Sequence, residues 1–251
     1  MTIKTATLNG VATIEIARPE KKNAITGAMY HQMAAALDAA KADGAVRAVL
    51  ITGQPGIFTS GNDIDDFMKR PPGEPPAFVF MRALMGCDKP VIAAVTGAAI
   101  GIGTTLLLHC DFVYVSDEAR LAMPFVSLGL VPEFASSLIV PQLMGNVRAA
   151  EKLLLGDPFT GADAVDCGIA NAVLPAGEVV NHARRIAERF NALPPGAVRD
   201  SKTLMRRARE KLAVETIAVE GEVFAARLRS PEAQEAFSAF FQKRRPDFSK
   251  F

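Results

Sequence analysis

Two apolar, β-branched runs, each followed by a glycine-rich turn, constrain the fold of this chain more than any other feature. The first run, residues 46–52, precedes the turn 58–64 (FTSGNDI), and the second, residues 91–95, precedes 97–103 (GAAIGIG). Two such strands are predicted to deliver both turns to one place, where two peptide N–H groups point at a single oxygen. Donors fixed in this way stabilise an oxyanion or enolate formed on a thioester or similar carbonyl.

Strand-like and helix-like segments alternate through the first half of the chain, which predicts stacked β/α units. The expected strands are 12–16, 46–52, 91–95 and 112–116, and the expected helices are 26–42, 77–87 and 104–110. Pro71, Pro72, Pro75 and Pro76, together with Gly73, interrupt this pattern because proline continues neither a helix nor a ladder. We expect a mobile loop there, near whatever the first turn binds.

The sequence changes character after Gly156, where apolar residues recur at helical spacing with charges between them. The expected helices are 178–190, 197–208, 212–229 and 232–242. The C-terminal third is therefore predicted to be helical.

Composition excludes several classes of protein. With 251 residues, 49% of them hydrophobic, the chain has enough material for one large or two small domains with a sizeable core. A net charge of +1 without a basic stripe argues against a nucleic-acid partner. The three cysteines form no CxxC pair and are interpreted as core residues. His31, His109 and His182 fit no metal or triad spacing, so no metal is expected.

The N-terminal residues resemble no signal peptide, and no stretch reaches the roughly 18 apolar residues of a membrane span. We therefore expect a soluble, cytoplasmic protein without a membrane partner. The last three residues, Ser249, Lys250 and Phe251, only approximate a peroxisomal address, and we interpret that as coincidence.

The two turns resemble those of the crotonase family, also called the enoyl-CoA hydratase/isomerase family. The likeness extends to 18–24 (RPEKKNA), which resembles the first CoA-contacting loop, to the second catalytic stretch from Leu121 to Gly145, and to a C-terminal signature at 240–248. The resemblance implies an α/β, crotonase-like spiral of repeated ββα units over 1–195. It also implies a C-terminal helical region over 196–251 that covers the CoA pocket and assembles homotrimers or hexamers. A helical cap on its own subunit is the alternative.

Residue matching to this family assigns the two oxyanion donors to the peptide N–H groups of Asn62 and Ile102. Both side chains would be incidental to that role. The alternative is that the glycines of both turns only let chain segments pass closely.

The resemblance also separates two reactions. Hydratases of the family hold a water between two glutamates, but the matching positions here carry Thr105 and Phe125, so efficient hydration is doubtful. Residues 60–63 and 124–137 instead resemble the Δ3,Δ2-enoyl-CoA isomerase branch, whose single catalytic carboxylate corresponds to Glu133. Apolar neighbours would raise the pKa of Glu133, while a helix beginning at Pro132 would lower it. The sequence leaves that balance open, and also leaves open an ordinary acidic residue in a first helical turn.

Further substrate contacts follow from the same matching. They are Lys22, Ala24, Ser60, Gly61, Asp63, Ile64, Gly101, Phe125 and Lys243. Lys21 and Lys22 are interpreted as phosphate partners or as solvated lysines, and Asp63 as a substrate contact or a turn-stabilising Asx residue. Acyl-chain length is expected to depend on walls from segments such as 67–80. No separate cofactor is expected, because the CoA thioester is itself the substrate.

The resemblance thus implies a 3-enoyl-CoA to trans-2-enoyl-CoA isomerase that acts in fatty-acid or related acyl-CoA degradation. A hydratase or another enolate-forming enzyme of the same fold is one alternative, and a non-catalytic acyl-CoA-binding protein is another. A dinucleotide site is disfavoured because Leu106 occupies the place of the third glycine. A P-loop is disfavoured because no Gly-Lys-Ser/Thr follows Gly53.

Overall fold

The computed structural model describes residues 2–68 and 73–251, and its centre is a six-stranded sheet. The strand order is β1-β2-β3-β5-β7-β10, and all neighbours are parallel except the β1–β2 hairpin. The strands are β1 (Ile3–Leu8), β2 (Val11–Ile16), β3 (Ala48–Thr52), β5 (Val91–Val95), β7 (Phe112–Ser116) and β10 (Ala172–Leu174). The expected runs at 12–16, 91–95 and 112–116 are confirmed as strands, and the run 46–52 forms a strand from Ala48.

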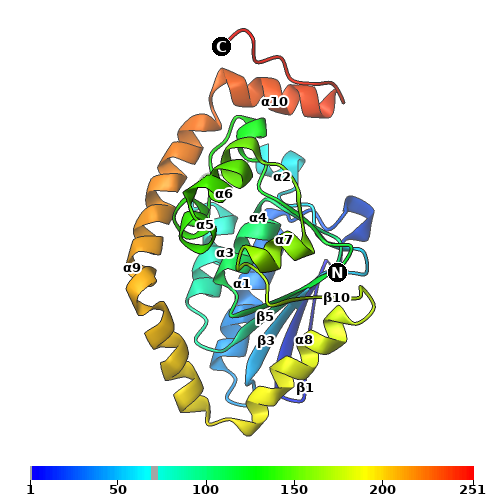
Figure 1. Cartoon of the computed structure of the whole chain (residues 1–251), viewed down its shortest axis with the longest axis vertical. Helices are drawn as coiled ribbons and strands as arrows, with labels where there is room; N and C mark the ends of the chain where they lie inside the picture. Colours follow the sequence, from blue (N-terminus) through cyan, green and yellow to red (C-terminus); the bar gives the residue numbers. More distant parts are fainter. Residues whose placement is uncertain (1, 69–72) are drawn as a thin grey trace.

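Helices cover both faces of this sheet, which explains its near-continuous apolar strands. On one face, Val49 and Ile51 join a core with α1 (Gly27–Ala42) and α3 (Pro76–Met85). On the other face, Ala48 and Leu50 pack with α8 (Val179–Glu188). Alternate residues of one strand therefore enter two different cores. Figure 1 shows α1 and α8 on opposite sides of the strands.

A second, four-stranded sheet has the order β4-β6-β8-β9. Its strands are β4 (Ile57–Thr59), β6 (Ala98–Ile100), β8 (Arg120–Ala122) and β9 (Phe159–Thr160). The chain alternates between the sheets, so that β3, β5 and β7 are each followed by a short strand of the smaller sheet. This repeat, with its intervening helices, is the predicted spiral of ββα units. The strands expected from the sequence did not include these short ones, which carry the chain from the long apolar runs to the glycine-rich turns.

Shorter helices connect these units. They are η1 (Pro19–Lys21), α2 (Ile64–Met68), α4 (Ile102–Thr105), η2 (Leu106–His109), η3 (Val126–Leu128), α5 (Ser136–Met144), α6 (Asn146–Ala150), η4 (Glu151–Leu155), α7 (Gly161–Asp166) and η5 (Arg189–Ala192). The helix expected over 104–110 begins earlier, at Ile102, and tightens into a 3₁₀ turn. The loop expected around the prolines lies partly outside the described residues, because Pro71 and Pro72 fall between the two ranges; Gly73 is described, Pro75 precedes α3 and Pro76 begins it.

The C-terminal third is helical, as expected, but two of its predicted helices are one. Residues 195–227 form α9 (Pro195–Arg227), a 33-residue helix that runs along one side of the molecule towards α10 (Pro231–Phe241) (Figure 1). The gap between the expected segments, residues 209–211, contains Arg, Glu and Lys, which are good helix formers. Near its start α9 is fixed to the core, because Lys202 and Arg206 pair with the Asp111 carboxylate at 2.7 and 2.9 Å.

Two findings concern the membrane-spanning helices and metal sites that the sequence did not predict. Among the helices of the described part of the chain, none combines the length and apolar character that crossing a membrane requires. Within residues 2–68 and 73–251, no three His, Cys, Asp or Glu side chains are grouped to hold a metal ion.

Candidate active site

The two glycine-rich turns meet, because they leave neighbouring parallel strands at the same edge of the small sheet. β4 pairs with β6 through Ile57 with Ala98 and Thr59 with Ala99. A Cβ on Gly61, whose φ is +91°, would lie 2.9 Å from the Ile100 carbonyl oxygen, and one on Gly103 would lie 2.5 Å from Thr59 Cγ2. Both glycines are therefore required for the close approach of the turns.

The peptide N–H of Asn62 is directed away from its own chain neighbours. Asn62 forms an isolated parallel bridge with Ile25, in which Ile25 N donates to Gly61 O (2.8 Å) and Asp63 N donates to Ile25 O (2.9 Å). In a parallel ladder the residue between these two bonds points its own N–H to the opposite side. Within the described residues, the Asn62 N–H donates to no protein acceptor.

The peptide N–H of Ile102 is similarly unused. Gly101 adopts φ +57° and donates its N–H to Ala122 O at 2.9 Å, so that pairing with β8 ends there. Ile102 is the first residue of α4, and N–H groups in a first helical turn have no intrahelical partner. No protein acceptor for it exists in the part of the chain that the structure describes. The two meeting turns thus present two unpaired N–H donors.

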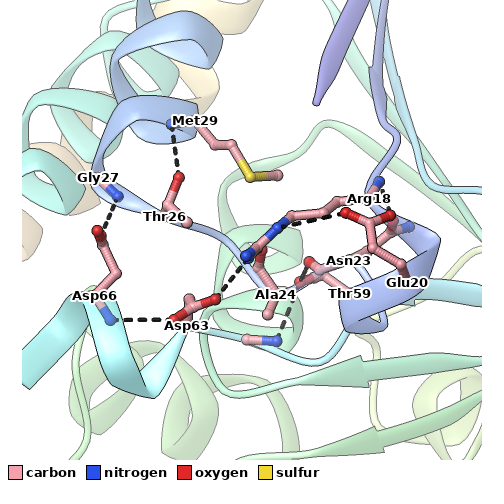
Figure 2. Close-up of polar contacts among 11 residues, drawn as sticks. Arg18, Glu20, Asn23, Ala24, Thr26, Gly27, Met29, Thr59, Asp63 and Asp66 are labelled. Carbon is pink, nitrogen blue, oxygen red and sulfur yellow. Dashed lines mark hydrogen bonds and ion pairs between the residues drawn. The ribbon is translucent and has the colours of Figure 1, made fainter. Parts of the chain in front are cut away.

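The loop that precedes α1 holds the first turn in place (Figure 2). The Arg18 guanidinium donates from Nη1 to Asp63 Oδ2 at 2.6 Å and to Ala24 O at 3.0 Å. Asn23 is fully buried, accepts from Arg18 N at 2.7 Å, and donates to the carbonyls of Ile57 and Phe58 at 3.1 Å. This network ties the predicted CoA loop to the strand and the turn that carry Asn62.

The environment of Asp63 favours the ionised form of its carboxyl group. Burial acts to raise the pKa of Asp63, but hydrogen bonds from Arg18 and from Asp66 N, with the charges of Arg18 and Lys21, leave it below its ordinary value. The Asp66 N–H contact, 3.1 Å from Asp63 Oδ1, spans the first turn of α2 (Figure 2). Asp63 therefore has the Asx-type role that the sequence left as an alternative.

Glu133 lies in an irregular segment before α5, which begins only at Ser136. The prediction of a helix starting at Pro132 was wrong, because Phe134 and Ala135 both adopt left-handed conformations, with φ of +58° and +57°. Such backbone costs roughly 1 kcal/mol or more per residue and persists only where its surroundings fix it. Glu133 is therefore not a first-turn acid of a helix.

Glu133 is partly buried, and among the described residues the side-chain partner of its carboxylate is the Thr105 hydroxyl of α4, which donates to Oε1. Burial raises the pKa of Glu133 to about 8, the Thr105 hydrogen bond opposes this rise, and the charge of Glu220 on α9 adds to it. Desolvation thus decides the balance that the sequence left open. Tyr30 of α1 lies close by, donating to Asn62 Oδ1 at 2.6 Å, and its pKa is raised by burial and by the charge of Glu133.

Asn62 and Glu133 line one cavity of about 350 Å³ between α2, α3 and α9. Its other walls are mostly apolar, and the contributing residues are Phe67, Pro75, Ala77, Phe78, Met81, Phe134, Ile217, Ala218, Glu220, Gly221, Glu222, Phe224 and Ala225. The segment 67–80 contributes walls, as expected, although residues 69–72 lie outside the described ranges. This cavity is a largely apolar chamber whose polar lining residues are Asn62, Glu133, Glu220 and Glu222.

The remaining predicted contacts are of two kinds: residues that the fold places at the two turns, and exposed lysines. Ser60 donates its N–H to Lys22 O at 3.1 Å, Ile64 begins α2, and Gly101 approaches the buried Phe125 ring, whose Cε1 would be 3.9 Å from a Cβ there. The Lys22 and Lys243 side chains are exposed, and no ion pair within the described residues involves either. The sequence placed Arg18 in the predicted CoA loop 18–24 without giving it a role of its own, and it did not identify Tyr30 or Glu220 as site residues. The local signal for Glu220 was the glycine beside it inside a helical pattern.

The stacked ββα units define a crotonase-like fold, and comparison with known proteins agrees. The family model described as enoyl-CoA hydratase/isomerase matches residues 6–250, and the chain belongs to this family. The solved structure of Pseudomonas aeruginosa OdaA is similar, with a TM-score of 0.93 and 54% identity over 95% of this chain and 98% of that one.

Curated relatives include both isomerases and hydratases. Human enoyl-CoA delta isomerase 2 is 40% identical over 214 residues, covering 81% of this chain and 54% of that protein. The chain therefore spans about half the length of this isomerase. The 2,3-dehydroadipyl-CoA hydratase of Escherichia coli K12 is 28% identical over 244 residues, covering 95% of this chain and 94% of that protein.

Proposed function

We propose that this protein is a Δ3,Δ2-enoyl-CoA isomerase of acyl-CoA degradation. The observation that carries the proposal is the partly buried Glu133 carboxylate, which lines one cavity with Asn62. The turn of Asn62 meets that of Ile102, and within the described residues neither peptide N–H has a protein acceptor. Glu133 removes a C2 proton from a 3-enoyl-CoA, giving a dienolate whose oxygen the two N–H groups hold. The same carboxyl returns the proton to C4. The CoA thioester is the substrate, and no separate cofactor takes part.

The electrostatics of Glu133 suit this step. A base with a pKa of about 8 is a stronger proton acceptor than an ordinary carboxylate and can still be ionised near neutral pH. Each N–H donor is expected to stabilise the transition state by roughly 3 kcal/mol, and the base to contribute about 10²- to 10⁴-fold in rate. Because the base must be ionised, kcat/KM should rise with pH towards about 8.

CoA is proposed to bind along the loop that the Arg18 network ties to the first turn. Lys22 and Ala24 with the backbone of Ser60, Gly61 and Ile64 would line the pantetheine and adenine path. Gly101 and Phe125 would border the thioester, and Lys243 would reach a phosphate. Asp63 serves this path by holding the turn, since both its carboxylate oxygens accept protein hydrogen bonds.

Hydration is the second candidate, because the family and the Escherichia coli relative include it and a second carboxylate, Glu220, lines the same cavity. Both oxygens of Glu220 accept hydrogen bonds from the Ala135–Ser137 segment, which leaves it poorly placed to activate a water. The positions of the hydratase glutamates carry Thr105 and the buried Phe125. Isomerisation is therefore the better supported reaction.

Assembly into a homotrimer or hexamer is proposed as well. The exposed apolar residues Met205, Leu212, Val219 and Val223 recur along α9 at intervals of seven, seven and four, which places them on one helix face. A second copy would cover this face. Light scattering should give a multiple of the chain mass, reduced towards one chain by Met205→Glu; a monomeric wild type would reject the proposal.

The deciding experiment offers purified protein 3-enoyl-CoA and, separately, trans-2-enoyl-CoA, and follows conjugated-thioester absorbance and product mass. Isomerisation without a mass change, abolished in Glu133→Gln, is expected. Normal turnover by a folded Glu133→Gln protein would reject Glu133 as the base, and rapid water addition to the 2-enoyl substrate would favour the hydratase. Absence of both reactions and of α-proton exchange in heavy water would favour an acyl-CoA-binding protein.

A further inference from the structure

Glu220 is a buried carboxylate that the proposed chemistry does not use. It lies in the middle of α9, is 7% exposed, and lines the same cavity as Glu133. Its Oε2 accepts from Ala135 N at 2.7 Å, and its Oε1 accepts from Ser137 N at 3.0 Å and from Ser137 Oγ at 2.5 Å. All these donors belong to the first turn of α5 and the residue before it. The carboxylate therefore caps the N-terminus of a helix far from it in the sequence.

The segment that Glu220 holds is the one that carries Glu133. Phe134 and Ala135, both left-handed, connect Glu133 to α5. The His109 ring stacks on Phe134, with ring centroids 3.8 Å apart, and its Nε2 lies 2.8 Å from Phe134 O. Because a carbonyl only accepts, Nε2 carries the proton. Ser136 Oγ donates to Glu133 O at 2.7 Å and completes the fixation of this turn.

We propose that Glu220 is a positioning residue of the isomerase, which fixes the left-handed turn at Phe134 and Ala135 and thereby directs the Glu133 carboxylate at the substrate carbon. The inference rests on the proposed function. The positioning role explains why the Glu220 carboxylate lies in a mostly apolar wall of the cavity. Three donors converge on it, and a carboxylate accepts from all three on two oxygens, whereas the corresponding amide has one acceptor oxygen and adds two donors. A buried charge without a cation is tolerated only where such donors compensate it.

The same charge also acts on the base. The titratable groups coupled to Glu133 are Glu220 from α9 and, through the charge of Glu133 itself, Tyr30 from α1, and the Thr105 hydroxyl of α4 faces Glu133 directly. On the far side of Phe134 lies His109, whose pKa burial lowers to about 3, with Arg206 and Arg209 behind it. The Glu220 charge raises the pKa of Glu133. Its removal should therefore lower that pKa while also releasing the turn.

The test compares Glu220→Gln with wild type and with Glu215→Gln, a control at an exposed glutamate of the same helix. We expect kcat on 3-enoyl-CoA to fall on the order of 10²-fold, because small misplacements of a reacting group have that effect. KM should change less than about threefold, since a misplaced base affects the transition state more than substrate binding. The acid limb of the kcat/KM profile should move to lower pH. Glu215→Gln should match wild type in all three measurements.

Two further measurements keep the inference testable. If Glu220→Gln does not fold, Ser137→Ala removes one bond to Oε1 and should lower kcat several-fold at unchanged KM, with Ser137→Thr restoring it. Exchange of the substrate α-proton in heavy water, followed in wild type, tests the proposed function separately from the positioning role of Glu220. A wild type that neither exchanges nor isomerises rejects the proposed function, whereas an active wild type matched in kcat and pH profile by Glu220→Gln, or by Ser137→Ala, rejects the positioning role.

Discussion

The hydroxyl of Thr105 donates a hydrogen bond to Oε1 of Glu133. Thr105 occupies the position at which, by resemblance, hydratases of the family carry a glutamate. The difference matters for the proposed chemistry, because a second carboxylate would share a water with Glu133, whereas a hydroxyl stabilises the ionised form of the proposed base.

Thr105→Val should therefore raise the pKa of Glu133 further. A hydrogen bond to a charged group contributes roughly 1.5–3 kcal/mol, equivalent to about one pH unit or more. We expect the acid limb of the kcat/KM profile to move up by about one unit, with a loss of about tenfold at pH 7. Thr105→Ser keeps the hydroxyl and should resemble wild type. Superimposable pH–rate profiles for the Val and wild-type proteins would contradict the assignment.

Glu133→Gln should stabilise the protein while abolishing turnover. The folded-state pKa of Glu133, about 8, lies above its ordinary value of 4.5. The stability linked to its protonation is fully present below the ordinary value and is lost as pH rises through about 8. Glutamine does not ionise, so we expect the melting temperature of the variant to exceed that of wild type at pH 9, by an equivalent of about 2–5 kcal/mol.

The comparison at pH 4 provides the contrast, since Glu133 is then protonated in the folded state and mostly protonated in the unfolded state, so the two proteins should melt at nearly the same temperature. Glu118→Gln, at an exposed glutamate, is the matched control and should change nothing at either pH. An equal difference between Glu133→Gln and wild type at both pH values would show that burial of this carboxylate is not the cause.

Arg18→Met should weaken both the fold and the site, because it leaves the largely buried Asp63 carboxylate without its partner. We expect a loss of about 3 kcal/mol in the free energy of unfolding by denaturant, together with lower kcat. Asp63→Asn added to Arg18→Met should recover part of the stability. Lys4→Met, which breaks the exposed ion pair with Glu15, should cost less than about 1 kcal/mol. If Arg18→Met and Lys4→Met lowered the free energy of unfolding by similar amounts, the importance of the Arg18–Asp63 pair would be contradicted.

Gly221→Ala should change the choice of acyl chain. A Cβ on Gly221 would lie 2.8 Å from Phe78 Cζ, so the Phe78 ring must move, and both residues line the cavity. We expect KM to rise several-fold for long 3-enoyl-CoA substrates and little for short ones, since one methylene in an apolar pocket changes binding by about 1–3 kcal/mol. Phe78→Ala should relieve the effect in the double variant. Gly196→Ala, at a position in α9 without neighbours, is the control, and an unchanged chain-length profile in Gly221→Ala would contradict the prediction.

The main elements of the fold could be predicted because their residues carry strong local patterns. Strands such as β5 and β7 are continuous apolar runs, and α1 begins at a threonine that caps it. The strands of the small sheet have two or three residues and are too short to show a period. β1 was missed because only Ile3 among its residues is buried. The boundary between a spiral core over 1–195 and a C-terminal helical region over 196–251 stays a prediction, and so does the cytoplasmic location.

The site was predicted only where family motifs lie in one segment. Asn62, Ile102 and Glu133 each belong to such a segment, and their roles stay predictions until they are measured. The partners that fix them are distant in sequence, since Arg18 reaches Asp63 across 45 residues and Glu220 reaches Ser137 across 83. The left-handed Phe134 and Ala135 gave no signal, because neither is the glycine that such a conformation favours.

Glu220 and Gly221 are consecutive residues of α9, yet one caps the segment that carries the proposed base and the other sets the place of an aromatic wall. A change in the rotation or pitch of this helical turn would alter both the proposed proton transfer and the proposed chain-length preference. New substrate preferences should therefore be easier to evolve or to engineer on α3, which contributes Phe78 and Met81, than on α9. In this enzyme scaffold, α3 is the adaptable wall of the chamber and α9 the constrained one.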